Sequence, residues 1–398
     1  MSWRTIRLAN IAVAHRQIIG PDSPAKSERP YLGLEQIEAG TGRILNCDGN
    51  PAEGKSTTFA FDERHILYGK LRPYLNKVAT PDRDGRCSTE IIPLLPTGVD
   101  RSFLAFLLRT DRVINGAMAE TTGSRMPRAD VDALLRLEVT IPDSLEEQRR
   151  IAARLKAQLA EVDAARQAAR AQLRDVALLQ RRLLQAAFDR LVCAPTTLGC
   201  ILNEIQTGKS FLTAEVLARP DELGVLKVSA VSWAQFRADQ AKALKGEYAP
   251  AENHRVKQDD LLISRANTRE LVGAVVLVER DYPMRLLSDK TLRLVVDESR
   301  ANKDYLLLAL RTELARKHIE LYATGTSDSM RNISQDVIAS IPILLPPLDD
   351  QRHIVARLKS QLDETDNMAQ SVTAQLAEIE RLPQRLLDQA FNDVEPSP

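Results

Sequence analysis

The sequence predicts an α+β fold in which two mixed α/β heads alternate with two long helices. One segment occurs twice, as residues 148–188 and 351–391, which lie 203 residues apart and align without a gap. About half of the aligned positions are identical, and both copies carry a helical pattern of apolar residues. Each copy follows a stretch of roughly 150 residues with features of short strands, and those two stretches have little sequence in common. Because repetition decides the organisation of a chain before any other feature does, we expect a pseudo-two-fold internal repeat.

Composition permits such an arrangement and excludes little. With 398 residues the chain is long enough for two or three domains with complete cores. We expect boundaries at residues 1–142 and 193–343 for the heads, and at 143–192 and 344–398 for the helical regions. Lys+Arg and Asp+Glu number 54 each, so the overall charge gives no sign of a protein that coats nucleic acid or a membrane.

The cysteines and the N-terminus predict the compartment. Cys47, Cys87, Cys193 and Cys200 lack the spacing of a metal knuckle, and four cysteines in a chain of this length do not indicate a disulfide framework. The N-terminus has no apolar signal core, and no apolar run has membrane-spanning length. We expect a cytoplasmic protein with reduced thiols and no bound metal.

The first long helix is predicted to begin near Ser144, which can cap it, with Glu147 three residues later in a capping-box arrangement. A heptad pattern follows, and its length corresponds to roughly 60 Å of helix. Its apolar positions are Ile151, Leu155, Leu159, Val162, Ala165, Ala169, Leu173, Val176, Leu179 and Leu183.

The second long helix repeats this pattern, with Asp349 as the expected cap and a kink or late break at Pro383. Its apolar positions are Ile354, Leu358, Leu362, Thr365, Met368, Val372, Leu376, Ile379, Leu382 and Leu386. Since one such helix alone would expose its apolar stripe, we expect the two to pack as an antiparallel pair. The residues expected to make that contact are Leu155, Leu159, Val162, Leu173, Leu183, Leu358, Leu362, Val372, Leu376 and Leu386.

The heads are predicted to share an order of elements. In the first head, residues 65–69 and 91–95 have the pattern of strands, and residues 102–114 that of an amphipathic helix. In the second head, strands are expected at 261–264, 273–278 and 292–296, followed by a helix at 305–322. A polar loop and an apolar strand then lead into each long helix.

No catalytic constellation is readable in the sequence. Residues 49–56 fit the P-loop pattern GxxxxGK[ST], which requires a buried strand before it and a helix directly after it. Residues 57–61 instead have the pattern of a strand, so we interpret the segment as a polar loop. A P-loop ATPase remains an alternative, for which loss of nucleotide binding on Lys55→Ala would be the test.

Polar, basic loops occur at matching places in both heads. Arg and Lys bind guanine edges or phosphates, Asn binds adenine, and Ser and Thr bind phosphates, so their recurrence favours DNA contacts. In the first head the candidates are Lys70, Arg72, Tyr74, Asn76, Lys77, Arg86, Ser88, Thr89, Ser124 and Arg125. In the second head they are Lys209, Ser210, Ser264, Arg265, Asn267, Thr268, Arg269, Lys290, Ser329, Arg331 and Asn332.

The chain resembles the specificity (S) subunits of type I restriction-modification enzymes. The resemblance rests on the repeated start of each helix, residues 141–149 and 345–352, and on its repeated end, residues 183–188 and 386–391. The loop of residues 70–77 also resembles that family's first-head loop. One departure is Asp143-Ser144 in the first copy, where the second has the more usual Pro346-Pro347.

The resemblance implies two target-recognition domains, each reading one half of a split, asymmetric site in double-stranded DNA. It implies an antiparallel coiled coil whose length, measured against a DNA turn of about 34 Å, sets the unread spacer. The chain itself would be non-catalytic and without cofactor. S-adenosylmethionine-dependent adenine methylation would belong to two modification subunits, and ATP- and Mg-dependent translocation and cleavage to restriction subunits. The alternative from another class is a coiled-coil scaffold with two protein-binding heads.

Overall fold

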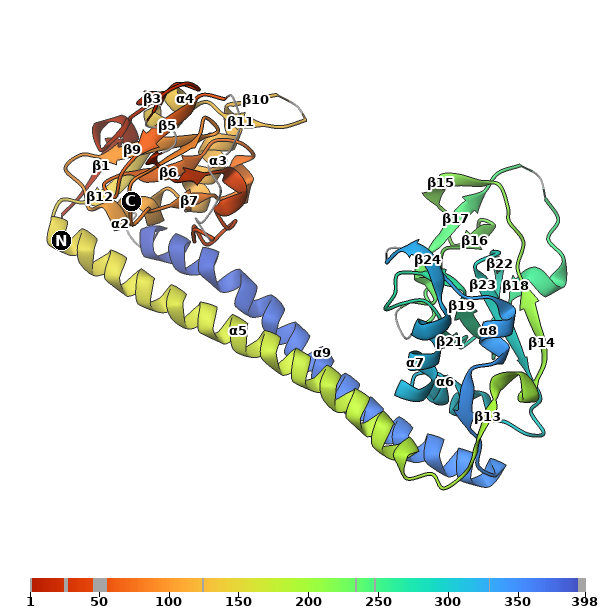
Figure 1. The fold of residues 1–398 in the computed structure, drawn as a ribbon. Coiled ribbons are helices and arrows are strands. Elements are labelled where there is room, and N and C mark those ends of the chain that lie inside the picture. The colour runs from red at the N-terminus through yellow and green to blue at the C-terminus, as the bar shows by residue number, and fades with distance from the viewer. Residues whose placement is uncertain are drawn as a thin grey trace. The chain divides into compact units, whose positions relative to one another are not determined.

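The computed structural model describes residues 2–24, 28–45, 56–123, 125–232, 235–246, 248–328 and 330–392. The chain divides into two compact units, Met1–Leu173 with Ser371–Pro398 and Arg174–Gln370. Each unit contains one head and a part of each long helix, α5 (Leu145–Asp189) and α9 (Leu348–Asn392) (Figure 1). The two units are described separately.

Within the described residues, the first unit contains four small sheets and three short α-helices. Its strands are β1 (Trp3–Arg7), β2 (Ala12–Ala14), β3 (Ile18–Ile19), β4 (Tyr31–Leu32), β5 (Thr58–Phe61), β6 (Ile66–Gly69), β7 (Val78–Ala79), β8 (Gly85–Ser88), β9 (Ile91–Pro96), β10 (Thr121–Thr122), β11 (Arg128–Ala129) and β12 (Glu138–Pro142). Its short helices are α2 (Arg101–Leu107), α3 (Asp111–Ala119) and α4 (Val131–Arg136).

The second unit has the same kinds of element. Its strands are β13 (Pro195–Thr197), β14 (Leu202–Thr207), β15 (Thr213–Leu217), β16 (Gly224–Leu226), β17 (Ala241–Leu244), β18 (Arg255–Val256), β19 (Leu261–Ser264), β20 (Ala266–Asn267), β21 (Val275–Leu277), β22 (Tyr282–Leu286), β23 (Thr291–Val296), β24 (Thr324–Ser327), β25 (Met330–Asn332) and β26 (Pro342–Leu344). Its short helices are α6 (Lys303–Ala309), α7 (Glu313–Tyr322) and α8 (Gln335–Ala339).

Both heads contain a central sheet of the same topology. The strand order is β2-β9-β6-β7 in the first head and β14-β23-β19-β21 in the second, and every pairing is antiparallel. The other large sheets differ, with order β3-β5-β8-β4 in the first head and the five-stranded order β15-β17-β16-β22-β18 in the second. Heads with little common sequence therefore share the sheet that leads into their polar loops.

Each head buries residues from both long helices in its own core. Ile151 and Leu155 of α5 join Leu387 and Ala390 of α9 in the first core. The second core contains Ile354 and Leu358 of α9, the equivalents of Ile151 and Leu155, together with Ala187, the equivalent of Ala390, and Phe188 of α5. Because each large apolar side chain contributes about 1.5–3 kcal/mol when buried, the helices are part of the heads rather than appendages to them.

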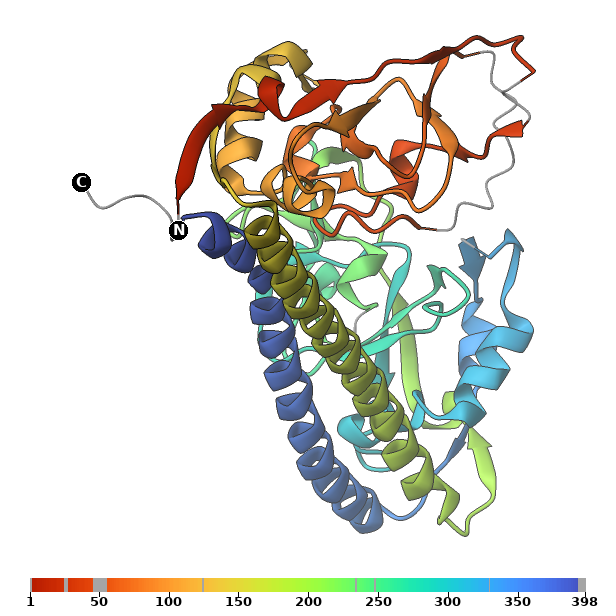
Figure 2. The same cartoon turned by 90° about the vertical axis from the view of Figure 1, so that its left-hand side faces the viewer.

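Within each unit the segments of α5 and α9 lie side by side and run antiparallel (Figures 1 and 2). In the first unit Leu155 shares a core with Leu387, while Arg170, further along α5, pairs with the earlier Glu380 at 3.2 Å. In the second unit Gln180 donates to the Thr365 hydroxyl at 3.1 Å. The expected pairing of the helices therefore agrees with the structure inside each unit.

A buried glutamine joins α5 to the first head. Gln148 is fully buried, its Oε1 accepts the Asp100 backbone N–H at 2.8 Å, and its Nε2 donates to the Pro142 carbonyl at 2.8 Å. Asp100 is the residue that caps α2, where its carboxylate accepts the Phe103 N–H. One side chain thus links the start of α5, the end of β12 and the start of α2.

Gln351 performs the same task in the second unit. It is fully buried, accepts the backbone N–H of Asn302, which caps α6, at 2.9 Å, and donates to the Pro346 carbonyl at 2.8 Å. A further bond reaches the Arg300 carbonyl at 3.1 Å. The sequence comparison identified both glutamines as repeated, and the structure supplies the reason.

The ends of the long helices cap a short helix in the head that they reach. Asp388 of α9 accepts the Asp111 N–H at the start of α3, and Gln185 of α5 accepts the Glu313 N–H at the start of α7. Each of the repeated end segments also places an aromatic ring against the head. Phe391 lies 5.2 Å from Phe103 between ring centroids, and Phe188 lies 5.3 Å from Tyr305.

Two sequence predictions of a single helix were wrong. Residues 102–114 form α2 and the start of α3, and residues 305–322 form most of α6 and all of α7. The breaks occur at equivalent positions, because the hydroxyls of Thr110 and Thr312 donate to the carbonyls of Leu107 and Ala309. Such side-chain bonds compete with the next helical turn, while the apolar periodicity continues across the break.

The starts of the long helices were predicted with mixed success. The Ser144 hydroxyl accepts the Glu147 N–H at 3.4 Å, as expected of a cap, but the Glu147 carboxylate pairs with Arg150. Asp349 is not the cap of α9, which already begins at Leu348, and its carboxylate pairs with Arg352 at 3.0 Å.

Helix α9 runs through Pro383 without interruption, so no break occurs there, and the expected alternative, a kink, stays a prediction. Of the predicted apolar positions, Ala165, Leu179, Met368 and Leu382 are exposed, and the others are buried or half-buried. All ten residues expected to form the helix–helix contact are among the buried or half-buried ones.

Candidate nucleic-acid interface

Backbone hydrogen bonds bring the three polar loops of the first head together. Lys70, directly after β6, donates its backbone N–H to Glu90 at 2.9 Å and accepts the Ala129 N–H at 2.8 Å. The Arg72 N–H reaches the Pro127 carbonyl at 2.7 Å. Segments around residues 70, 90 and 128 therefore meet at the end of the central sheet, although the sequence separates them by up to 59 positions.

The loop after β6 holds an unusual backbone conformation. Arg72 and Asn76 both adopt positive φ angles, 52° and 49°, on either side of the short helical turn Pro73–Leu75. A non-glycine residue held in the left-handed region is under strain, and such strain concentrates at functional sites. The conformation exposes Arg72 and leaves Tyr74 53% exposed at the tip of the loop.

Other residues of that loop serve the head itself. Asn76 is buried and donates to the Arg109 carbonyl at 3.0 Å, and the Lys77 ammonium donates to the Leu34 carbonyl at 2.6 Å. Arg86 is also buried, with its guanidinium over the Tyr31 ring. Asn76 and Arg86 therefore correct the predicted set of DNA-contacting residues, because neither side chain lies at the surface.

The remaining first-head candidates lie nearby. Arg125 is exposed in the segment between β10 and β11, and Ser88 and Thr89 are half-buried in the turn between β8 and β9. An ion pair of 3.0 Å between Arg128 and Glu90 joins the two segments. Ser124 lies outside the described residues.

The second head gathers its loops in the same manner. Arg265, directly after β19, donates its N–H to the Lys290 carbonyl and accepts the Ile333 N–H, both at 2.9 Å. Arg269 donates to the Asp328 carbonyl at 3.0 Å. Strand β20 pairs with β25, which places Asn267 opposite Arg331 and Ala266 opposite Asn332.

The fourth loop of this head joins the cluster through a glycine. A Cβ at Gly208 would lie 2.2 Å from the Leu287 carbonyl oxygen, so only glycine permits the close approach that sets Lys209 opposite Ser288. The Lys209 ammonium then lies 5.2 Å from the centroid of the Tyr248 ring.

The second-head candidates differ in exposure. Lys209, Ser210, Arg269 and Lys290 are exposed, and Arg265, Asn267, Thr268, Arg331 and Asn332 are half-buried. Ser264 is fully buried inside β19 and is a second correction to the predicted set, because its hydroxyl donates to the Ala266 carbonyl. Ser329 lies outside the described residues.

Two of the half-buried side chains already have partners. Asn267 donates from Nδ2 to the Ser232 hydroxyl at 2.8 Å, and Arg331 donates from Nη1 to the Gly325 carbonyl at 2.8 Å. Among the described residues, the buried Arg331 Nε has no acceptor. These contacts fix the directions of the two side chains beside the exposed Lys290 and Arg269.

Most of the P-loop-like segment lies outside the described residues, but the chain directly after it is strand β5 rather than the helix that a P-loop requires. Within the described residues, no group of three His, Cys, Asp or Glu side chains could hold a metal ion, and no helix is long and apolar enough to cross a membrane. Cys87, Cys193 and Cys200 are free thiols, and burial raises the pKa of Cys87 to about 12.

The comparison with family models gives one match. The model described as the type I restriction modification DNA specificity domain matches residues 204–381. This range covers the second head and most of α9.

Curated relatives are similar over longer parts of the chain than this range. The EcoEI specificity subunit of Escherichia coli is 28% identical over 197 residues, which are 49% of this chain and 33% of that protein. The EcoKI specificity subunit of Escherichia coli K12 is 26% identical over 330 residues, 73% of this chain and 68% of that protein. The chain thus spans about a third of the first relative and two thirds of the second.

Solved structures share the fold over nearly the whole chain. One comes from work on complex assembly and conformational transition of the type I R-M system, with a TM-score of 0.76 at 23% identity, covering 98% of this chain and 97% of that one. The HsdS subunit of Thermoanaerobacter tengcongensis has a TM-score of 0.54 at 22% identity, covering 98% and 96%. The resemblance inferred from the doubled helix is therefore confirmed, and the chain is HsdS-like, similar to the specificity subunits of type I restriction enzymes.

Proposed function

We propose that the chain is the sequence-specific DNA-binding subunit of a type I restriction-modification system and reads a bipartite, asymmetric site. The observation that carries the proposal is the same gathering of polar loops in both heads. The loop after β6 contacts the β10–β11 hairpin, and the loop after β19 contacts the β24–β25 hairpin. Two heads with one framework and different loop residues are suited to reading two different half-sites.

The exposed cations in each cluster are the proposed DNA contacts. Arg72 and Arg125 of the first head, and Lys209, Arg269 and Lys290 of the second, are exposed. Arginine can bind guanine O6 and N7 with both ends of its guanidinium, whereas lysine binds as a point charge. We assign the arginines to base edges or phosphates and the lysines chiefly to phosphates, which position a protein on the duplex.

The long helices are proposed to form an antiparallel coiled coil that relates the heads by a pseudo-two-fold axis and sets the spacer. The repeated contacts of Gln148 and Gln351 with the heads support this, because each helix start is fastened in the same manner. Deleting one heptad from both helices is expected to change the preferred spacer in a site-selection assay. An unchanged spacer would contradict the proposal.

The catalytic steps are proposed to belong to partners. Two modification subunits would bind S-adenosylmethionine and methylate adenine, restriction subunits would use ATP and Mg, and this chain would hold no cofactor. The assembly would act in the cytoplasm. One structural neighbour comes from work on complex assembly of the type I R-M system, which supports a role in such a complex.

A selection experiment tests the proposed function. The full chain, co-purified with modification subunits, is incubated with random duplexes, and the bound fraction is sequenced. We expect two short motifs separated by a constant unread spacer. Arg72→Ala should relax only one motif and Lys290→Ala should weaken binding through the other head. Absence of any enriched motif, together with stable protein partners at both heads, would favour a scaffold instead.

A further inference from the structure

The first unit contains a cavity of about 490 Å³ where α5 and α9 meet the head. Its apolar lining consists of Phe106, Leu159, Val162, Ile379 and Pro383. A volume of this size and a lining that combines apolar surface with a few charges are typical of small-molecule sites. Nothing in the proposed DNA contacts uses this cavity.

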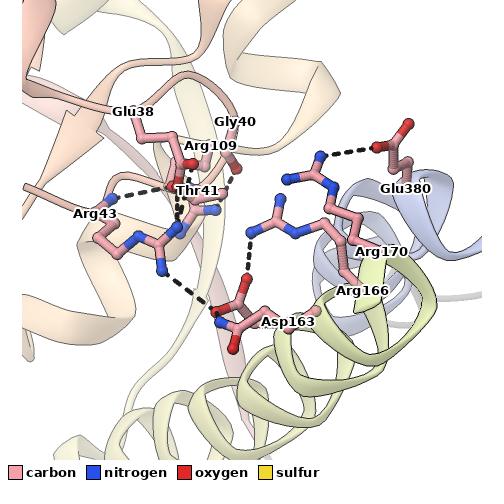
Figure 3. A network of polar contacts seen from close by, with 10 residues as sticks. Glu38, Gly40, Thr41, Arg43, Arg109, Asp163, Arg166, Arg170 and Glu380 are labelled. Atoms are coloured by element: carbon pink, nitrogen blue, oxygen red, sulfur yellow. Dashed lines mark hydrogen bonds and ion pairs between the residues drawn. The ribbon is translucent and has the colours of Figure 1, made fainter. Parts of the chain in front are cut away.

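Charged side chains surround the cavity, and most of them neutralise one another (Figure 3). Asp163 pairs with Arg166 and, at 3.4 Å, with Arg43, which also pairs with Glu38 at 3.1 Å. Burial would raise the pKa of Asp163, but the hydrogen bond and charge of Arg166 and the charge of Arg43 lower it overall. These carboxylates are therefore ionised and already engaged.

The count of lining charges leaves one cation in excess. Four lining residues are cationic, Arg43, Arg109, Lys156 and Arg166, and three are anionic, Glu38, Asp163 and Glu380. Glu380 is itself paired with Arg170 of α5, which lies outside the lining. Because Glu380 is engaged in this way, two lining cations form no ion pair among the described residues, Arg109 and Lys156.

Arg109 is the buried member of this pair. It is only 5% exposed, and its guanidinium donates to the Gly40 carbonyl. Its Nε is buried without an acceptor in the described part of the chain, and burial lowers the pKa of Arg109 to about 10. A buried guanidinium without a counter-charge is unfavourable, so the site is electrostatically incomplete as it stands.

The second unit contains an arginine at the same place, with a different electrostatic environment. Arg311 occupies the equivalent position, in the same Leu-Arg-Thr triplet between two short helices. Burial lowers the pKa of Arg311, while the charge of Asp366 raises it. Asp163 lies 203 residues before Asp366 in the repeat, but Arg43 and Arg166 hold its carboxylate, and Arg109 is left without one.

We propose that this cavity binds a small organic acid whose single carboxylate neutralises Arg109. The apolar body of the ligand would lie against Phe106, Leu159 and Ile379, and Lys156 at the exposed rim would add a second, solvated cation. A carboxylate with an apolar body fits better than a phosphate, because a phosphate would not use the apolar lining. The ligand would stabilise the junction of the first head with the long helices.

The test uses the full-length chain with 4-phenylbutyrate as the probe and its neutral analogue 4-phenylbutanamide as the comparison. Isothermal titration calorimetry measures both affinities. The acid is expected to bind roughly tenfold more tightly than the amide, since a charge-assisted hydrogen bond to a buried guanidinium contributes on the order of one decade of affinity. Equal affinities for the two compounds would overturn the proposal. So would the absence of binding of either compound up to 10 mM, a Kd that corresponds to a binding free energy of roughly −3 kcal/mol.

Three variants locate the effect. Arg109→Gln is expected to abolish the preference for the acid, while Arg311→Gln, the matched control in the other unit, leaves that preference unchanged. Ala160→Trp places a large side chain into the cavity from an exposed helix position and should abolish binding of both compounds without unfolding the chain. If Arg109→Gln does not fold, as judged by its melting temperature, the Ala160→Trp variant tests whether the compounds bind in this cavity. Undiminished binding to a folded Ala160→Trp variant would contradict the assigned site.

Discussion

The two units agree in how a head is fastened to the long helices and differ in what lies inside and on each head. Buried glutamines, Gln148 and Gln351, make the same two kinds of bond in each unit. By contrast, the position of Arg293 in β23 corresponds to Pro93 in β9. The charge of Asp366 also raises the pKa of Arg311, whereas burial is what shifts the pKa of Arg109. The repeated contacts define the framework that both units share, and the unrepeated ones are the charged interactions in which the heads differ.

The largest effect is expected at an ion pair that only the second head contains. Arg293 and Asp260 are both buried and lie 2.7 Å apart. Arg293→Met leaves the Asp260 carboxylate buried and unpaired, which should lower the free energy of unfolding by about 3–5 kcal/mol. Urea denaturation measures the change, and Arg219→Met, at an exposed arginine of the same head, is the control.

A double variant sharpens this first prediction. Replacing both partners, Arg293→Met with Asp260→Leu, should recover much of the lost stability, because no charge is then left buried. A double variant as unstable as Arg293→Met would show that the pair acts through its other hydrogen bonds, such as that to the Asn253 carbonyl.

The next effect should be similar in both units. Gln148→Leu removes the partner of one backbone N–H and one carbonyl, and Gln351→Leu that of one backbone N–H and two carbonyls, at about 1–3 kcal/mol for each group left buried. We expect losses of about 2–4 kcal/mol in urea denaturation, with the exposed Gln172→Leu as control. A large loss for one glutamine and none for the other would end the view that they are equivalent.

A smaller effect should distinguish the residues that recognise DNA from those that stabilise the head within the loop after β6. Arg72→Ala should weaken binding of the complex to DNA by about 1–3 kcal/mol, with relaxed selectivity at one half-site and unchanged stability. Asn76→Ala should instead lower the melting temperature, because its amide holds the Arg109 carbonyl. Fluorescence anisotropy with duplexes altered in either half-site measures the first effect. If Arg72→Ala lowered the melting temperature and Asn76→Ala weakened DNA binding instead, the loop would have to change conformation on DNA.

The smallest effect concerns the two helix-end caps, Asp388 and Gln185. Burial, then the charge of Asp388 and its hydrogen bond, raise the pKa of Asp111. A carboxyl whose pKa is raised by folding binds its proton more tightly in the folded chain, so stability falls as pH rises through its titration.

Asp388→Asn removes this repulsion and keeps the accepting oxygen. The variant should be more stable at pH 7 by a few tenths of a kcal/mol, since the pair is largely solvated, and the gain should shrink in acid as Asp111 is protonated and the repulsion is lost. Thermal melts at pH 7 and pH 3 measure it. Gln185→Asn, at the uncharged cap, should give no pH-dependent gain.

The sequence predicted the long helices well because their apolar pattern persists over many turns, and α5 and α9 begin within a few residues of the expected positions. It missed the breaks at Thr110 and Thr312, where a threonine hydroxyl bonds a backbone carbonyl and ends the helix although the apolar periodicity continues. The strands at 261–264 and 91–95 were predicted from short apolar runs bounded by polar residues.

The candidate interface was predictable only as a list of loops. That Lys70 lies beside Glu90 and Ala129 depends on strand pairing between distant segments, which one sequence does not reveal. The burial of Arg86 and Asn76 could not be read from residue type, since arginine and asparagine are usually exposed. The signal that was available for Gln148 and Gln185 was recurrence of a polar residue at the repeat interval of 203. For Arg109 it was the Leu-Arg-Thr triplet, which recurs at Arg311 in the second head.

The central claim is that two heads with one framework read two different half-sites. The most direct measurement maps methylated adenines in host DNA by single-molecule sequencing, with the chain expressed beside its genomic neighbours and with the chain deleted. We expect a split methylation motif with a constant spacer, which disappears when the chain is deleted. Methylation that is unchanged when the chain is absent, or that shows no bipartite motif when it is present, would contradict the account.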